Sequence, residues 1–169
     1  MSNIAILVGP EYEDSELDIP CAALRVAGHK VTFVGDKAGQ KLRGKKGESS
    51  TTIDVAGTDA HAADYSAVVI PGGYSPDHLR TNPAVVQFLE EAIRGNALVA
   101  AVCHGPSLLI EADACRGVRL TSWPSIRKDL VNAGAHWEDK PVVIDGKFIT
   151  SRNPSDLPAF STAVLDALS

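Results

Sequence analysis

The sequence has few cysteines, and none of them form a CxxC pair. There are three: Cys21, Cys103 and Cys115. An odd number without paired spacing does not make a disulfide framework and is typical of a reducing compartment. No apolar run reaches the roughly 18 residues that cross a membrane, and the first residues form no basic leader-like segment. We therefore expect a cytoplasmic protein with no membrane partner.

Several ligand-binding and catalytic motifs are also missing. The sequence contains no G-x-S-x-G of a serine hydrolase, no G-x-G-x-x-G of a dinucleotide site and no H-x-x-x-H or H-x-H. Its scattered histidines predict no metal site, and we expect no cofactor. The formal net charge of −5 argues against a nucleic-acid partner. One basic run, residues 41–48, is typical of a solvated turn, with an anionic ligand as the alternative.

Short apolar runs alternate with segments of helical spacing along the 169 residues. The length suits one domain, residues 1–169. Unalternating apolar runs predict a mostly parallel sheet with helices on both faces, an open doubly wound α/β fold. The expected strands are 3–9, 30–35, 50–55, 66–73, 97–102 and 118–122, with a hairpin at 141–151. The expected helices are 13–28, 81–96, 104–112, 124–134 and 154–169, and Pro20 is expected to kink the first helix or delay its start.

Cys103 stands where the apolar run 97–102 ends and a helix is expected to begin. A strand-to-helix turn of this kind is the nucleophile elbow, which holds a side chain out over a site. The start of the helix also favours a thiolate. The alternative is a buried structural cysteine. His104 is a candidate general base, although neighbouring side chains at an elbow diverge. Cys21 and Cys115 have no such context, and we assign them to structure.

Two further segments follow strands at the same predicted edge of the sheet. Gly72 and Gly73 end the strand 66–73, and paired glycines let backbone N–H groups form an oxyanion hole. The segment 11–16, "EYEDSE", carries four carboxylates. Most of them fit a solvated helix start, but one is expected to lie near the thiol, where burial and like charge would keep it protonated.

The motifs "AVCHGP", "VIPGG" and "EYEDSE" together resemble the PfpI family of the ThiJ/PfpI superfamily. The segments "GKKGESSTTID", "SPDHLR" and "ITSRNPSDLPAF" are similar to its intracellular protease and stress-protein branch, so the resemblance covers essentially the whole chain. It implies a flavodoxin-like fold, related to the class I glutamine amidotransferases. It also implies self-association as a homodimer or a larger homo-oligomer.

The resemblance implies roles for individual residues. Cys103 would be the nucleophile, with His104 as its partner and Glu13 as an acid contacting the thiol. The N–H groups of Gly73 and His104 would form the oxyanion hole. In members assigned as peptidases, a carboxylate after the glycine pair, here Asp77, reaches the histidine of a neighbouring subunit.

Two more positions are expected to bind substrate. Gly72 lies in the glycine pair, and Trp123 stands where related sequences often have tyrosine, so the phenol hydroxyl is absent here.

Three activities fit a reactive Cys103. The leading hypothesis is a stress-protective enzyme of the glyoxalase or deglycase type, in which the thiol attacks small reactive carbonyls or their adducts. The second is a peptidase or amidase that uses Cys103, His104 and Asp77 across a subunit interface. The third is a redox-sensing stress protein, in which Cys103 is oxidised.

Overall fold

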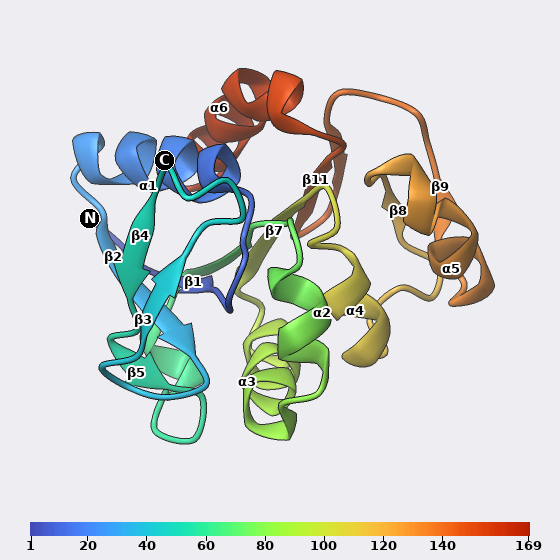
Figure 1. Ribbon diagram of the computed structural model, residues 1–169. Helices are drawn as coiled ribbons and strands as arrows, with labels where there is room; N and C mark the ends of the chain where they lie inside the picture. Colours follow the sequence, from blue (N-terminus) through green and yellow to red (C-terminus); the bar gives the residue numbers. More distant parts are fainter.

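A computed structural model describes residues 1–169, and its main feature is one seven-stranded sheet (Figure 1). The strand order is β10-β11-β7-β6-β1-β2-β5. Every neighbouring pair is parallel except β10–β11. The strands are β1 (Asn3–Leu7), β2 (Lys30–Gly35), β5 (Val55–Ala56), β6 (Ala67–Ile70), β7 (Leu98–Val102), β10 (Val143–Asp145) and β11 (Phe148–Ser151). The predicted doubly wound, mainly parallel sheet is confirmed.

Helices cover both faces of the sheet, which is why its central strands are apolar on both sides. On one face α1 and α6 lie side by side, and Leu17 and Phe160 pack with Ile4 and Ile6 of β1. Helices α3 and α4 cover the other face. The helices are α1 (Asp14–Val26), α2 (Ser75–Arg80), α3 (Pro83–Arg94), α4 (Ser107–Glu111), α5 (Arg127–Asn132) and α6 (Leu157–Ala167), with short 3-10 segments η1 (Ala62–Asp64), η2 (Pro124–Ile126) and η3 (Pro154–Asp156). No helix is long and apolar enough to span a membrane.

Two small strand pairs lie outside the main sheet. β3 (Lys41–Arg43) and β4 (Ser50–Thr52) form an antiparallel hairpin, whereas β8 (Arg119–Leu120) and β9 (His136–Trp137) are parallel. The expected strand 118–122 ends early because the Thr121 N–H donates to the side chain of Thr150, not to a strand backbone.

Three local predictions are wrong in detail. Pro20 lies inside α1 and does not delay its start, which falls at Asp14; burial of the surrounding face against the sheet offsets the cost of proline, and the predicted kink stays a prediction. The helix expected from residue 104 begins only at Ser107, because residues 103–106 form a turn. Helix α2 follows the glycine pair, where no helix was expected.

Candidate active site

Three chain segments meet at the carboxyl edge of the sheet because β6 lies between β1 and β7. The segment after β1 bridges the one after β6 through Tyr12 and Gly73. The Glu13 N–H donates to the Gly72 carbonyl over 3.2 Å. This is the edge where open α/β sheets bind ligands.

Cys103 occupies a strained turn directly after β7. Its φ of 61° lies in the left-handed region, which non-glycine residues rarely adopt. The strand pairing continues through it, since its N–H donates to the Ser151 carbonyl and its carbonyl accepts from Trp123 N–H. Gly105 lets the turn close, because a Cβ there would lie 2.4 Å from the Ile70 carbonyl oxygen. The geometry is that of a nucleophile elbow, and the Cys103 residue is 8% exposed.

Glu16 is the carboxyl group that lies beside this thiol. Its side chain is fully buried in the first turn of α1, and its Oε2 accepts a hydrogen bond from the Gly72 N–H at 2.8 Å. Burial raises the pKa of Glu16 to about 7. Burial and then the charge of Glu16 raise the pKa of the Cys103 thiol. Oε1 of Glu16 is buried and has no hydrogen-bond partner. Near neutral pH the thiol therefore keeps its proton, while the carboxyl group is present in both its protonated and its ionised form.

Glu13 does not make the predicted contact with the thiol. Its carboxylate is buried, with Oε2 2.8 Å from Lys45 Nζ and Oε1 3.0 Å from Lys46 Nζ. Burial raises the pKa of Glu13, but its hydrogen bonds to the two lysines outweigh this effect and lower it. Glu13 precedes α1, whereas Glu16 lies within the first turn of the helix, so the two side chains leave the backbone in different directions.

The two glycines after β6 differ in what their N–H groups do. The Gly72 N–H is taken by Glu16 and is not free for substrate, contrary to the prediction. A Cβ on Gly72 would lie 2.6 Å from Glu16 Oε2 and 2.9 Å from Cys103 Cβ, so this close approach requires glycine. The N–H groups of Gly73 and His104 hydrogen-bond the Cys103 sulfur and favour its thiolate. These two donors therefore suit the predicted oxyanion hole.

The His104 ring contacts Cys103, although the side chains of neighbouring residues at an elbow usually diverge. Its Nδ1 lies 3.4 Å from the sulfur, and its Nε2 lies 3.2 Å from the Ser125 hydroxyl. The ring stacks on Trp123, with ring centroids 6.5 Å apart. Burial and then the charge of Lys45 lower the pKa of His104, against a smaller opposing effect of Asp77. The imidazole is therefore neutral near pH 7 and able to take a proton.

Asp77 lies on α2, at the edge of a cleft beside the thiol. The cleft has a volume of about 400 Å³ and is lined by Lys45, Gly73, Tyr74, Asp77, Arg80, His104, Ser107 and Ile126. Within one chain Asp77 makes no hydrogen bond to His104, whose Nε2 faces Ser125 instead. The cleft is large enough for a small molecule or the end of a modified side chain.

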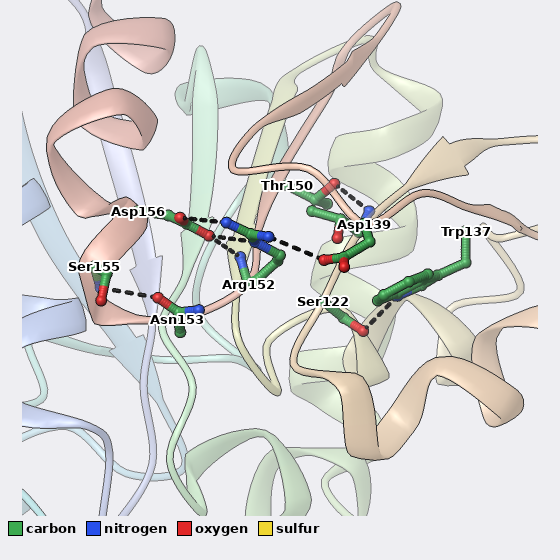
Figure 2. Close-up of polar contacts among 9 residues, drawn as sticks. Ser122, Trp137, Asp139, Thr150, Arg152, Asn153, Ser155 and Asp156 are labelled. Atoms are coloured by element: carbon green, nitrogen blue, oxygen red, sulfur yellow. Dashed lines mark hydrogen bonds and ion pairs between the residues drawn. The ribbon is translucent and has the colours of Figure 1, made fainter.

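A polar cluster holds the segment that carries Trp123 and Ser125 (Figure 2). The Trp137 indole N–H donates to Ser122 Oγ over 2.9 Å, and Ser122 Oγ donates to the carbonyl of Trp123. Nearby, the Arg152 guanidinium bonds Asp156 and Asp139, fixing the backbone just beyond β11. Sequence reasoning did not select Ser122, Ser125 or Glu16, since serines in a loop and one carboxylate among four carry no separate signal.

Comparison with known proteins identifies the family. The DJ-1/PfpI family model matches residues 2–167, and the chain belongs to the DJ-1/PfpI family. "Protein/nucleic acid deglycase 2" of Escherichia coli is 44% identical over 166 residues, which are 98% of this chain and 96% of the relative. "Putative cysteine protease YraA" of Bacillus subtilis is 42% identical, over 98% of this chain and 97% of the relative.

Solved structures agree with the sequence comparison. A two-domain protein from Anabaena variabilis, with DJ-1/ThiJ/PfpI-like and ferritin-like domains, is 47% identical with a TM-score of 0.98. The match covers 99% of this chain and 48% of that one. DJ-1beta of Drosophila melanogaster is 31% identical with a TM-score of 0.90, over 99% of this chain and 91% of that one.

Proposed function

We propose that the protein is a cofactor-independent enzyme in which Cys103 attacks small reactive carbonyls or their adducts. The observation that carries this proposal is the position of the Cys103 thiol, held at a strained elbow between a buried carboxyl group and two backbone N–H groups. Such an arrangement supplies a nucleophile, a proton and an oxyanion site within one small volume. The relative named as a deglycase supports the same class of chemistry.

The proposed first step is addition of the thiol to an aldehyde. The thiol proton moves to Glu16 as the sulfur attacks, the S–C bond forms, and the carbonyl π pair moves to oxygen. The N–H groups of Gly73 and His104 stabilise that oxygen, which then takes the proton from Glu16 to give a hemithioacetal. With a 2-oxoaldehyde, His104 takes the C1 proton and returns it to C2, and the proton of the C1 hydroxyl passes to the C2 oxygen, so that C1 becomes the carbonyl of a thioester and C2 carries the hydroxyl. Water then hydrolyses it to the 2-hydroxy acid and frees Cys103.

The test is turnover of methylglyoxal by wild type, Cys103→Ser and Glu16→Gln. We expect kcat to fall by at least about 10³ in Cys103→Ser, since the nucleophile is lost. We expect a fall of about 10²–10⁴ in Glu16→Gln, which can donate a hydrogen bond but cannot accept the proton. Cys21→Ala controls for general effects of removing a buried thiol. Equal rates in wild type and Cys103→Ser would overturn the proposal.

A second candidate is hydrolysis of peptides or amides by the same thiol. It is favoured by the contact between Cys103 Sγ and His104 Nδ1, through which the neutral imidazole can take the thiol proton, and by the relative named for cysteine protease activity. It requires an acid to orient His104, and Asp77 could act only from a second copy of the chain. Asp77→Asn separates the two candidates: peptidase activity should fall much more than methylglyoxal turnover, because only the peptidase mechanism requires Asp77 to orient a histidine, and Asp77 makes no hydrogen bond within its own site.

A further inference from the structure

The basic run at residues 41–48 is not a solvated turn throughout, because one of its lysines enters the candidate site. Lys45 Nζ lies 2.8 Å from Glu13 Oε2, and the side chain is 36% exposed. Lys45 lines the same cleft as Gly73 and His104. Lys46 pairs with the other oxygen of Glu13 but is more exposed, at 53%, and does not line the cleft.

The chemistry proposed for this site places a negative charge on the Cys103–Glu16 pair and then on the substrate oxygen. Without a nearby cation, only neutral N–H groups would stabilise this charge. Above pH 7 Glu16 is ionised and Cys103 keeps its proton, so this buried pair carries one negative charge. Attack on a carbonyl moves that charge onto the substrate oxygen. The N–H groups of Gly73 and His104 supply only partial positive charges, and a buried charge without a counter-ion is costly.

Lys45 is the cation placed to balance this charge. The hydrogen bond to Glu13, and then the charges of Glu13, Cys103 and Glu16, raise the pKa of Lys45, so its ammonium stays protonated. The other charged residues of the cleft are less suited. Arg80 is engaged by Glu111 at 3.2 Å, and Asp77 is negative.

The loop that carries Lys45 is held in place by hydrogen bonds to Tyr12 and Asp14. The Lys45 N–H donates to the Tyr12 carbonyl over 2.9 Å. The buried Asp14 carboxylate accepts N–H groups from Lys46, Glu48 and Ser49 at 2.9–3.0 Å. The ammonium is thus held by its backbone as well as by Glu13, which preorganises it toward the cleft.

We propose that Lys45 is a further catalytic residue, whose ammonium stabilises the Cys103 thiolate and the substrate oxyanion, and that Glu13 is the positioning residue that aims it. This inference rests on the proposed carbonyl chemistry of Cys103. In the addition step Lys45 gives up no proton; it acts through its charge and through donors not used by Glu13. A role in positioning Lys45 explains why Glu13 is buried at the site without touching the thiol.

The experiment compares Lys45→Met with Lys46→Met as a matched control, since each variant removes one of the two lysines on Glu13. Two readouts are measured: the pH dependence of Cys103 alkylation by neutral iodoacetamide, and kcat and KM for methylglyoxal. In Lys45→Met we expect the apparent pKa of the thiol to rise by about one unit and kcat to fall about tenfold to a hundredfold. In Lys46→Met we expect changes below about twofold. Lys45→Arg should recover most of the rate.

The outcomes separate this inference from the function on which it rests. If iodoacetamide labels Cys103 with the same pH profile in wild type, Lys45→Met and Lys46→Met, the role of Lys45 is wrong while the nucleophile stands. If wild type neither labels at Cys103 nor turns over methylglyoxal, the proposed function itself fails. Circular dichroism and thermal melting check that each variant folds, and Lys45→Gln serves as the second neutral variant.

Discussion

At the scale of single residues, the chemistry depends on where one proton lies between Cys103 and Glu16. Burial disfavours ionisation of both groups, and each negative charge disfavours the other. The carboxyl group therefore keeps a proton at a pH where an exposed glutamate has lost it. It can return that proton to the oxygen of an adduct, which an ordinary carboxylate cannot do.

The raised pKa of Glu16 predicts a pH-dependent stability. Between the ordinary value of 4.5 and the folded value of about 7, the folded protein binds the extra proton. The stabilisation from Glu16 is therefore complete below pH 4.5 and is lost as pH rises through 7. Glu16→Gln has no ionisable group at this position and does not lose stability in this way. The free energy of unfolding of Glu16→Gln minus that of wild type should therefore increase by about 3 kcal/mol between pH 4 and pH 8.

Urea unfolding of both proteins at a series of pH values measures this difference. Glu13→Gln is the control with the opposite sign, because the pKa of Glu13 is lowered and its stabilisation appears above the ordinary value. A difference between wild type and Glu16→Gln that stays constant with pH would contradict the raised pKa of Glu16.

Gly72 provides a second test at this scale. In Gly72→Ala the new methyl group would lie 2.6 Å from Glu16 Oε2, so either the carboxyl group or the elbow must move. We expect a loss of about 1–3 kcal/mol in stability together with loss of turnover. Gly95→Ala is the control, since its nearest neighbour would be 3.3 Å away. Thermal melting and methylglyoxal turnover check the pair, and unchanged activity in Gly72→Ala would be inconsistent with the geometry.

The sequence predicts a carboxyl group beside the thiol but points to the wrong glutamate. Four carboxylates within six residues are chemically alike, and the family resemblance favoured Glu13. The distinction lies in helix geometry. Glu16 stands four residues before the buried Pro20 and eight before the buried Leu24, on the helix face that packs against the sheet. That spacing is a usable signal, whereas the carboxylate cluster alone is not.

At the scale of elements, the loop between β3 and β4 is held to α1 by Asp14. The carboxylate accepts three backbone N–H groups. Burial raises the pKa of Asp14, but these hydrogen bonds outweigh that effect and lower it. Because the loop carries Lys45, this contact connects the start of the first helix with the cleft.

Asp14→Asn should therefore loosen the loop. The amide presents N–H donors where the backbone already donates, so at least one N–H is left unpaired, at a cost of about 1–3 kcal/mol. We also expect lower kcat, since Lys45 loses part of its support. Asp18→Asn is the matched control, because Asp18 is exposed and accepts only from the Ser49 hydroxyl. Urea unfolding and turnover of the two variants should differ; equal behaviour would show that the loop is held elsewhere.

Near this site, the residues at which a strand or helix begins and ends are harder to predict from the sequence than the presence of that strand or helix. The strand ending at Val102 follows directly from its apolar run, but the turn that delays α4 to Ser107 depends on a left-handed Cys103 and on Gly105 packing against the Ile70 carbonyl. These are tertiary contacts, which local spacing does not contain. Helix α2 has six residues and begins with Ser75-Pro76, too short for a periodic signal.

At the scale of the whole molecule, the alternation of apolar strands with helices in the sequence determines the parallel sheet. It predicts that the segments after β1, β6 and β7 share one edge, and the strand order confirms this. It cannot predict which side chains face each other across that edge. The extent of the chain as a single domain, and its self-association, remain predictions.

Self-association can be tested through the second candidate function. If Asp77 completes the site of a neighbouring subunit, Cys103→Ser and Asp77→Asn should each lose peptidase activity. A refolded equal mixture should then regain about a quarter of the wild-type rate, because half of randomly paired dimers contain one complete site. The mixture is compared with each variant alone. No recovery in mixed dimers would exclude an Asp77 that acts between subunits.

The central claim is that the Cys103 thiol is the reacting group, and a titration against its alkylation tests it most directly. Wild type is treated with limiting iodoacetamide, the labelled fraction of Cys103 is measured by peptide and intact mass, and methylglyoxal turnover is measured on the same samples. The account predicts that activity falls in proportion to labelling of Cys103 and vanishes when one label per chain is complete, while the buried Cys21 and Cys115 stay unlabelled. Turnover that persists in protein fully alkylated at Cys103 would contradict it.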